Sequence, residues 1–372
     1  MMEAAAPLLA TNPRRPVDFD IALSLYPLGW SVRTNLLAIG LDYSSKQLGE
    51  RELPEPEITR PEQVLFRIRE VGICGTDREL ARFAFGYPPA GEEFLALGHE
   101  ALGEIVAMGA AVRDLRKGDL VVPTIRRACP GPCASCGAGR RDLCRTGDYR
   151  ERGIFGLHGY LSEFAVDSVR DMVTVPATLA SYAILVEPLS SVEKVVESVL
   201  RCHQADPQTA LVLGAGPIGI LAALRLQLQG IKVTVQSLEP EEEPRVQLLR
   251  KAGVRYERDG RDAVDLVIEA TGSAEAGLAG LNRLAPNGVL GLLGARDGHG
   301  EIRWLEMIRN NQTVVGSVNA ALSHFKRAVK TLGMLERRTL DALVTRTGRA
   351  HFRESISYPP AGAIKLVHVW AE

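Results

Sequence analysis

The chain lacks a long hydrophobic run, since no uninterrupted apolar stretch approaches the ~18 residues of a membrane-spanning helix. Its start also lacks the basic segment of a signal peptide, and Pro7 breaks the only short apolar patch there. An excess of charge is missing as well: 44 Lys and Arg against 45 Asp and Glu leave a net charge of -1. That balance offers nucleic acid or an anionic membrane no electrostatic attraction. We therefore expect a cytoplasmic protein without nucleic-acid or membrane partners.

Cysteines are few, six in 372 residues, but four of them lie close together at Cys129, Cys133, Cys136 and Cys144. Without a secretion signal, such clustering favours a metal site over disulfides. Four thiolates would complete a tetrahedral Zn²⁺ site, which is structural because no position stays open. Scattered core cysteines and a redox Cys-x-x-Cys remain the alternatives. Cys202 lies outside this group and is expected in the core.

Length and a hydrophobic content of 46% predict two domains. Residues 1–34 look like an appendage whose role the sequence does not reveal. Residues 35–190 contain short β-branched runs separated by Gly, Pro and Asp, which predict a mostly β domain of barrel character. After residue 190, strands and helices alternate, which predicts a doubly wound parallel sheet over 191–316. Residues 317–372 are expected to return to the first domain.

The second half contains these expected elements: helices over 191–200 and 218–229, and strands over 211–213, 232–235, 265–269 and 288–293. Between the strand at 211–213 and the following helix lies Gly214-Ala215-Gly216-Pro217-Ile218-Gly219, a GxGxxG turn. The first glycine permits the tight turn, the second lets the backbone approach a pyrophosphate, and the third allows close helix–strand packing. The helix N-terminus attracts the phosphates. This βαβ context predicts a dinucleotide site.

The acid that usually binds the adenosine ribose is missing at the end of the second strand, where Gln236, Ser237 and Leu238 stand. Glu239 follows, and two interpretations stay open. It either swings in as the ribose partner or belongs to the solvated acidic run at 241–243.

Cys74, His99 and Glu100 are candidate ligands of a second metal ion, because thiolate, imidazole and carboxylate together suit Zn²⁺. A catalytic zinc needs about three protein ligands and one open position. Glu187, before Pro188, could add a further carboxylate. Taken singly, each would be a core cysteine, a structural histidine or a surface glutamate.

Residues 98–112, GHEALGEIVAMGAAV, resemble the zinc signature of the medium-chain dehydrogenase/reductase superfamily. Within it the chain resembles the zinc-dependent glucose 1-dehydrogenases known from archaea. The stretches that carry this resemblance are ICGTDREL (73–80), GDLVVPTIRR (118–127), the cysteine cluster, ERGI (151–154), EPLSSVEK (187–194), GAGPIG (214–219), and GSVNA (316–320) with His324-Phe325. The resemblance implies a GroES-like catalytic domain joined to a Rossmann domain, with the active site in the cleft between them.

The resemblance also implies roles for individual residues. It places Cys74, His99 and Glu100 at the catalytic zinc, Glu187 as a ligand that comes and goes, Thr76 beside the reacting hydroxyl, and Glu151 and Asn319 on the sugar. The cofactor residues would be Gly214, Gly216, Pro217, Ile218, Gly219, Gln236, Ser237, Glu239, Thr271 and Asn319. The four clustered cysteines match the structural zinc, which makes two zinc ions per chain. A homo-oligomer, dimer or tetramer, is implied as well.

The implied reaction is oxidation of an aldose, with D-glucose the best candidate, at C1 to the lactone with hydride transfer to NAD(P). Zinc can lower the pKa of bound water from roughly 15.7 to about 7, whereas a neutral hydrogen bond such as one from Thr76 gives only about 1 kcal/mol. The alternatives are the same chemistry on a polyol, a sugar derivative or a secondary alcohol. A non-catalytic zinc- or nucleotide-binding protein of the same fold is more remote.

Three departures from the family pattern matter. Cys129 and Cys133 enclose three residues where relatives have two, and Arg309 stands where some relatives place a histidine near the sugar. Relatives that use NADP carry arginines where this chain has Ser237 and Leu238. We therefore expect NAD to be preferred and NADP to remain possible, unless a distant cation such as Lys232 or Arg245 reaches the 2'-phosphate.

Overall fold

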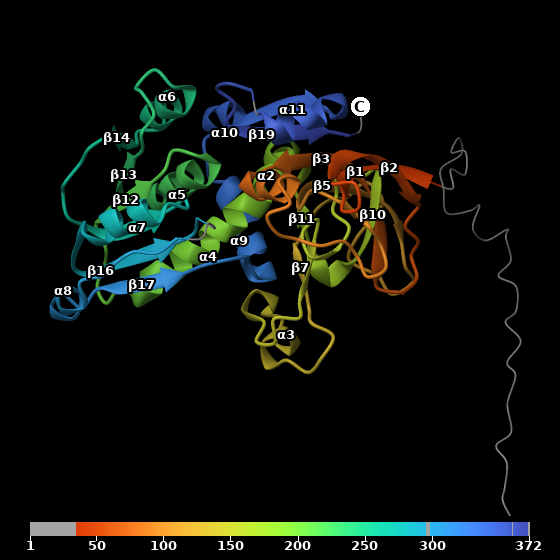
Figure 1. Cartoon of the computed structure of the whole chain (residues 1–372), viewed down its shortest axis with the longest axis horizontal. Helices are drawn as coiled ribbons and strands as arrows, with labels where there is room; N and C mark the ends of the chain where they lie inside the picture. The colour runs from red at the N-terminus through yellow and green to blue at the C-terminus, as the bar shows by residue number, and fades with distance from the viewer. Residues whose placement is uncertain (1–34, 295–297, 359, 371–372) are drawn as a thin grey trace, which may run out of the picture. The chain divides into compact units, whose positions relative to one another are not determined.

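The computed structural model describes residues 35–294, 298–358 and 360–370 (Figure 1). The predicted appendage of residues 1–34 lies outside this part. Within the described residues, no helix has the length and apolar character needed to cross a membrane.

Residues 35–185, together with residues 344–358 and 360–369 near the end of the described chain, form a part that is mostly strand. Its largest sheet has the order β11-β6-β5-β3-β19-β18, with β10 paired to β3, beside two three-stranded sheets, β2-β1-β4 and β7-β8-β9. The strands are β1 (Asn35–Asp42), β2 (Gln47–Pro54), β3 (Gln63–Ile73), β4 (Phe94–Ala96), β5 (Glu100–Met108), β6 (Leu120–Pro123), β7 (Arg126–Arg127), β8 (Arg150–Arg152), β9 (Gly156–Leu157), β10 (Phe164–Ser168), β11 (Met172–Val175), β18 (Val344–Gly348) and β19 (Lys365–Val369). The helices are α2 (Gly75–Ala81), α3 (Ala134–Gly137), α11 (Phe352–Ser357) and the short 3₁₀ helices η2 (Arg141–Leu143), η3 (Val169–Asp171), η4 (Ala177–Leu185) and η5 (Arg349–His351). Because β19 pairs with β3, the end of the chain lies in the same sheet as the segment that leads into Cys74.

The second half contains a six-stranded sheet of order β14-β13-β12-β15-β16-β17, in which every pairing is parallel. Its strands are β12 (Thr209–Leu213), β13 (Lys232–Gln236), β14 (Arg255–Glu257), β15 (Val264–Glu269), β16 (Leu284–Leu292) and β17 (Thr313–Gly316). Its helices are α4 (Val186–Cys202), α5 (Pro217–Gln227), α6 (Pro244–Lys251), α7 (Ala274–Leu281), α8 (Trp304–Arg309), α9 (Leu322–Leu332) and α10 (Arg337–Leu343). The prediction of a mostly β domain plus a doubly wound parallel sheet is confirmed.

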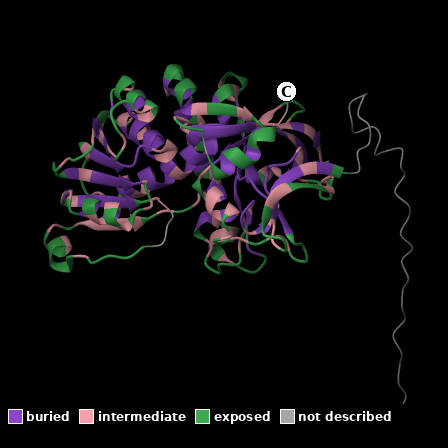
Figure 2. Cartoon of the chain, turned by 45° about the horizontal axis from the view of Figure 1, so that its top comes forward, coloured by how far each residue is buried: buried purple, intermediate pink, exposed green. Residues whose placement is uncertain are grey.

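Side chains of β12 alternate between two apolar cores, as the period of a strand requires. Ala210 and Val212 pack in the core that includes α4 and α5, whereas Leu211 and Leu213 pack in a second core with Leu281 of α7. Helices therefore cover both faces of the sheet, and Figure 2 shows buried residues along its strands.

Helix α4 begins at Val186, five residues before the predicted start at 191. Pro188 falls in its first turn, where a missing N–H costs no intrahelical hydrogen bond. The helix runs without interruption through residue 190, where the sequence suggested a domain limit, and the limits at 190 and 317 stay predictions. Its early start places Glu187 at the amino end of a long helix, and the same helix carries Lys194 two turns further on.

Candidate active site

Cys74 lies between β3 and α2 and caps the helix. Its backbone N–H donates to Asp77 Oδ2 at 2.9 Å, and the backbone N–H of Thr76 donates to Cys74 Sγ at 3.2 Å. The turn thus holds Thr76 beside the sulfur.

His99 precedes β5 and is buried against this turn. Its Nε2 lies 3.0 Å from Cys74 Sγ, while its Nδ1 lies 3.5 Å from Asp77 Oδ1. Cys74, Asp77 and His99 are the donors that the structure brings within 4.8 Å of one another. Because Asp77 faces the ring nitrogen opposite the sulfur, it orients the imidazole, as carboxylates behind metal-bound histidines do. Sequence reasoning missed Asp77, although its position three residues after a helix cap was a usable signal.

Glu100, which follows His99, is buried beside a cation. Its carboxylate forms an ion pair with Lys365 of β19, and Lys365 Nζ also donates to the carbonyl of Ile73 at 3.1 Å. Burial opposes the charge on Lys365, but Glu100 and Cys74 outweigh it and hold the Lys365 pKa above its ordinary value. Sequence reasoning missed Lys365 too, because it follows Glu100 by 265 positions in the sequence.

Glu187 is buried at the amino end of α4. Burial, followed by the nearby charge of Glu100, raises the pKa of Glu187 to about 8. Two carboxylates, an imidazole and a thiol that are buried near one another form the donor set that Zn²⁺ prefers, and a divalent cation would relieve the repulsion between the acids. These residues therefore fit a catalytic zinc.

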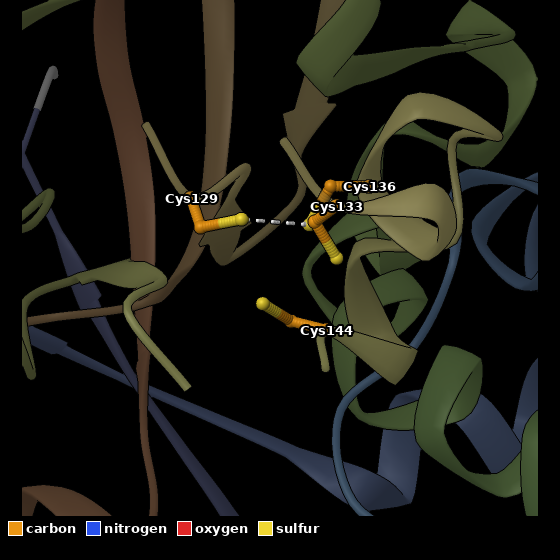
Figure 3. Close-up of side chains that lie close together, drawn as sticks. All are labelled: Cys129, Cys133, Cys136 and Cys144. Carbon is orange, nitrogen blue, oxygen red and sulfur yellow. Dashed lines mark hydrogen bonds between the residues drawn. The ribbon is translucent and has the colours of Figure 1, made fainter. Parts of the chain in front are cut away.

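The four cysteines of the second cluster converge, as Figure 3 shows. Cys129 Sγ and Cys136 Sγ lie 3.7 Å apart, close to the roughly 3.8 Å that tetrahedral Zn–S bonds of about 2.3 Å require. All six cysteines of the chain are free. Backbone N–H groups of Arg145 and Cys136 lower the pKa of Cys133 to about 6, which favours a thiolate. The extra residue between Cys129 and Cys133 does not prevent this convergence, and the cluster fits a structural zinc. We call residues 129–144 the cysteine lobe.

The GxGxxG turn joins β12 to α5. Gly214 has a φ of +103°, and a Cβ on Gly219 would collide with the carbonyl oxygen of Gly214. Gly216 caps α5, Pro217 begins the helix, and a Cβ on Gly216 would meet no described atom within 4 Å. The turn therefore leaves its helix N-terminus open to a phosphate, so these residues fit a dinucleotide.

The end of β13 holds several charges near the expected ribose position. Gln236 Oε1 accepts from Arg283 Nη1 at 2.8 Å, and Glu239 Oε1 lies 3.3 Å from Arg245 Nη1. Ser237 Oγ lies 3.1 Å from the hydroxyl of Tyr256. Arg245 is thus already paired with a carboxylate.

Two further cofactor candidates are placed by their strands. Lys232 begins β13 and lies at the end of the strand opposite Gln236, so the suggestion that it could reach the 2'-phosphate is wrong. Thr271 follows β15 beside Gly214, and its backbone N–H donates to Glu269 Oε1 at 2.6 Å.

The predicted sugar residues meet each other across the two halves of the chain. Asn319 Nδ2 donates to Glu151 Oε1 at 2.8 Å, and the same oxygen accepts from Arg126 Nε at 2.8 Å. Arg126 and Glu151 are cross-strand neighbours on β7 and β8, and both are buried. Sequence reasoning missed Arg126. Because Arg126 and Asn319 both donate to Glu151 Oε1, Oε2 is the freer acceptor of this carboxylate.

Comparison with known proteins agrees with this geometry. Residues 60–177 match the alcohol dehydrogenase GroES-like domain, and residues 180–364 match the glucose dehydrogenase C-terminus. A GroES-like domain followed by a parallel dinucleotide-binding sheet is the architecture of the medium-chain dehydrogenases, and the two candidate metal-ligand groups place the chain among the zinc-dependent members.

Within that class, the chain is 43% identical over 301 residues to the glucose 1-dehydrogenase of Thermoproteus tenax, covering 76% of this chain and 83% of the relative. It is 37% identical to that of Methanocella arvoryzae, covering 74% and 82%. The glucose dehydrogenase of Haloferax mediterranei, solved with NADP, Zn and gluconolactone, superposes with a TM-score of 0.83 at 31% identity, covering 90% of this chain and 99% of that one. The chain belongs to the zinc-dependent glucose 1-dehydrogenase family.

The two donor sets predict two zinc equivalents in the purified protein. Cys74→Ser should lose one equivalent and all activity while the unfolding temperature changes little, because Cys74 serves an open site. Cys136→Ser should lose the other equivalent and unfold at a lower temperature, because a closed site contributes folding energy. Elemental analysis and thermal unfolding measure both. A native content of one equivalent that Cys136→Ser leaves unchanged would refute the structural site.

Proposed function

We propose that this chain oxidises an aldose, with D-glucose the best candidate, at C1 to the lactone and transfers the hydride to a nicotinamide cofactor. The observation that carries the proposal is the Glu151–Asn319 pair, which joins a buried acceptor from the β half to an amide from the segment after β17. A polyhydroxylated ring needs such fixed partners, whereas a simple alcohol does not. The relatives from Thermoproteus tenax and Methanocella arvoryzae are glucose 1-dehydrogenases, and the glucose dehydrogenase of Haloferax mediterranei was solved with gluconolactone.

Cys74 and His99, with Glu100 or Glu187, would hold the catalytic zinc. Bound there, zinc would supply the Lewis acidity that makes the C1 hydroxyl acidic near neutral pH. Asp77 faces the His99 ring and orients it, and Lys365 forms an ion pair with Glu100. The remaining cysteines, Cys129, Cys133, Cys136 and Cys144, would hold the structural zinc.

The chain's own residues would accept the proton of the C1 hydroxyl and orient the sugar. Thr76 would pass the C1 hydroxyl proton toward solvent, and the nicotinamide cofactor, when bound, would supply the acceptor for the C1 hydrogen as hydride, so that the sugar becomes the lactone. Glu151 Oε2 accepts from one ring hydroxyl while Asn319 fixes its neighbour. The cofactor would lie along Gly214, Gly216, Pro217, Ile218 and Gly219, with Gln236, Ser237 and Glu239 at the ribose and Thr271 and Asn319 nearer the nicotinamide.

We also propose a cytoplasmic location, because six free cysteines suit a reducing compartment.

The sugar assignment predicts selective losses. Alanine at Glu151 would remove both the charge and the hydrogen-bond acceptor that the buried Arg126 contacts, whereas Glu151→Gln removes the charge but keeps an acceptor, so Glu151→Gln is the sharper change. Asn319 has a φ of +58°, and Asn319→Gly removes the amide while it tolerates that conformation. Each should lower kcat/KM for glucose by about 1.5–3 kcal/mol, roughly ten- to a hundredfold. Kinetics on a panel of aldoses, polyols and a simple secondary alcohol measure this. Equal losses on glucose and on the simple alcohol would show that these residues do not recognise the sugar.

Cofactor choice is predicted to favour NAD by about tenfold in kcat/KM, or about 1.4 kcal/mol, at low salt. The 2'-phosphate of NADP needs a free cation, but Arg245 is paired with Glu239. Glu239→Gln should reduce the preference for NAD over NADP, because it removes the carboxylate that pairs with Arg245. A clear preference of the native enzyme for NADP would contradict this interpretation of the turn.

The family resemblance implies a homo-oligomer, and two features of the chain support it. Strand β17 is an edge of its sheet in the described residues, which leaves one side for another strand. Beside it, α8 exposes Trp304 and Ile308, each 70% exposed. Figure 1 shows α8 next to β17, on the side of the parallel sheet away from α2. Arg309 lies in the last turn of this helix.

Ile308→Lys is therefore predicted to shift the protein toward monomers in light scattering. Met334→Lys, which alters another exposed apolar residue after α9, serves as the matched control and should leave the mass unchanged. A native protein that is already monomeric would end the proposal, and so would equal dissociation of both variants.

A further inference from the structure

A buried ion pair joins the cysteine lobe to the helix that crosses between the two halves. Lys194 of α4 is 7% exposed and Asp142 of η2 is 4% exposed, and Lys194 Nζ lies 2.9 Å from Asp142 Oδ2. The same ammonium donates to the carbonyl of Val318 at 2.9 Å. One cation thus connects the lobe to the segment that carries Asn319.

Arg126 closes the same network from the other side. Its Nη1 lies 3.4 Å from the Asp142 carbonyl, and its Nε donates to Glu151 Oε1 at 2.8 Å. Glu151 in turn accepts from Asn319. The contacts run in a closed ring from Asp142 through Lys194, the Val318–Asn319 segment, Glu151 and Arg126.

The ring lies beside a cavity of about 460 Å³ whose lining includes Asp142, Lys194, Ser317 and Val318. No described side chain other than Lys194 hydrogen-bonds the Val318 carbonyl. Asn319 has a left-handed conformation, with a φ of +58°, which asparagine adopts more readily than most residues. A buried ion pair is weak evidence for stability, because an apolar pair of similar volume often serves as well. The double contact of Lys194 instead suits a role in placing Asn319.

We propose that the Lys194–Asp142 ion pair positions the Glu151–Asn319 pair, so that sugar affinity depends on the geometry of the cysteine lobe. This inference rests on the proposed function, because it takes Glu151 and Asn319 to bind the sugar. Lys194 and Asp142 are positioning residues and not catalytic ones.

The test compares the removal of two different buried ion pairs of α4, one formed by Lys194 and one formed by its neighbour Glu193. Lys194→Met keeps the apolar stem but removes the charge. Lys194→Met with Asp142→Asn removes both charges in case the single variant folds poorly, and the new amide keeps one acceptor for Arg140, which also donates to the Asp142 carboxylate. Glu193→Gln is the matched control, since Glu193 is the neighbouring residue and pairs with Arg225 at 2.7 Å but does not contact Val318 or Asp142. KM and kcat for glucose and the thermal unfolding temperature are measured for each.

Both kinds of variant should unfold at lower temperature, but only the Lys194 variants should raise KM for glucose, by about tenfold, with kcat within about threefold. Lys194→Arg keeps the charge and the donors and should restore KM. A KM within twofold of the native value in the Lys194 variants, or an equal rise in Glu193→Gln, would overturn the inference.

Glu151→Gln, measured in parallel, separates the two levels of the argument. If it raises the glucose KM while Lys194→Met does not, the positioning role fails and the sugar subsite stands. If Glu151→Gln has no effect, the sugar subsite itself fails, and the positioning role fails with it.

Discussion

Buried charge is the constraint on which the site depends, because a charge taken out of water must be met by a partner. Here the partners come from distant parts of the chain: Lys365 meets Glu100, Arg126 meets Glu151, and Lys194 meets Asp142. Each pair ties two segments together at the place where a functional side chain is needed. The site therefore exists only when β19, α4 and the cysteine lobe are all docked.

The need to pair buried charges also distinguishes the two candidate metal sites from each other. Thiolates in the cysteine lobe face one another and leave no position open, so an ion there can only hold the lobe. The catalytic group differs, because Glu100 is held by Lys365 and Glu187 is buried with a raised pKa, which leaves carboxylates near the ion that need not all bind it. That freedom suits a site that must admit a sugar hydroxyl.

Local sequence patterns predicted much of the fold. Alternating runs predicted the parallel sheet, and the GxGxxG turn lies between β12 and α5 as its spacing requires. Helix α4 starts earlier than predicted because Pro188, which reads as a helix stop, sits in a first turn that tolerates it. Candidate metal ligands such as Cys74, His99 and the four clustered cysteines were also predictable, because few residue types can bind zinc.

The partners of those residues were not predictable in the same way. Asp77 had a local signal in its distance from Cys74, but Lys365 and Arg126 act through contacts that no periodicity encodes. For Lys232 the sequence was misleading, because Lys232 is close to Gln236 in sequence but lies at the opposite end of β13. Only the register of strands and the docking of helices reveal which charges meet.

Glucose that carries deuterium at C1 tests the central claim most directly. The account predicts that the deuterium moves to the reduced nicotinamide cofactor and that gluconolactone is the first product. Deuterium retained in the oxidised product would show that the enzyme attacks another position and would contradict the account.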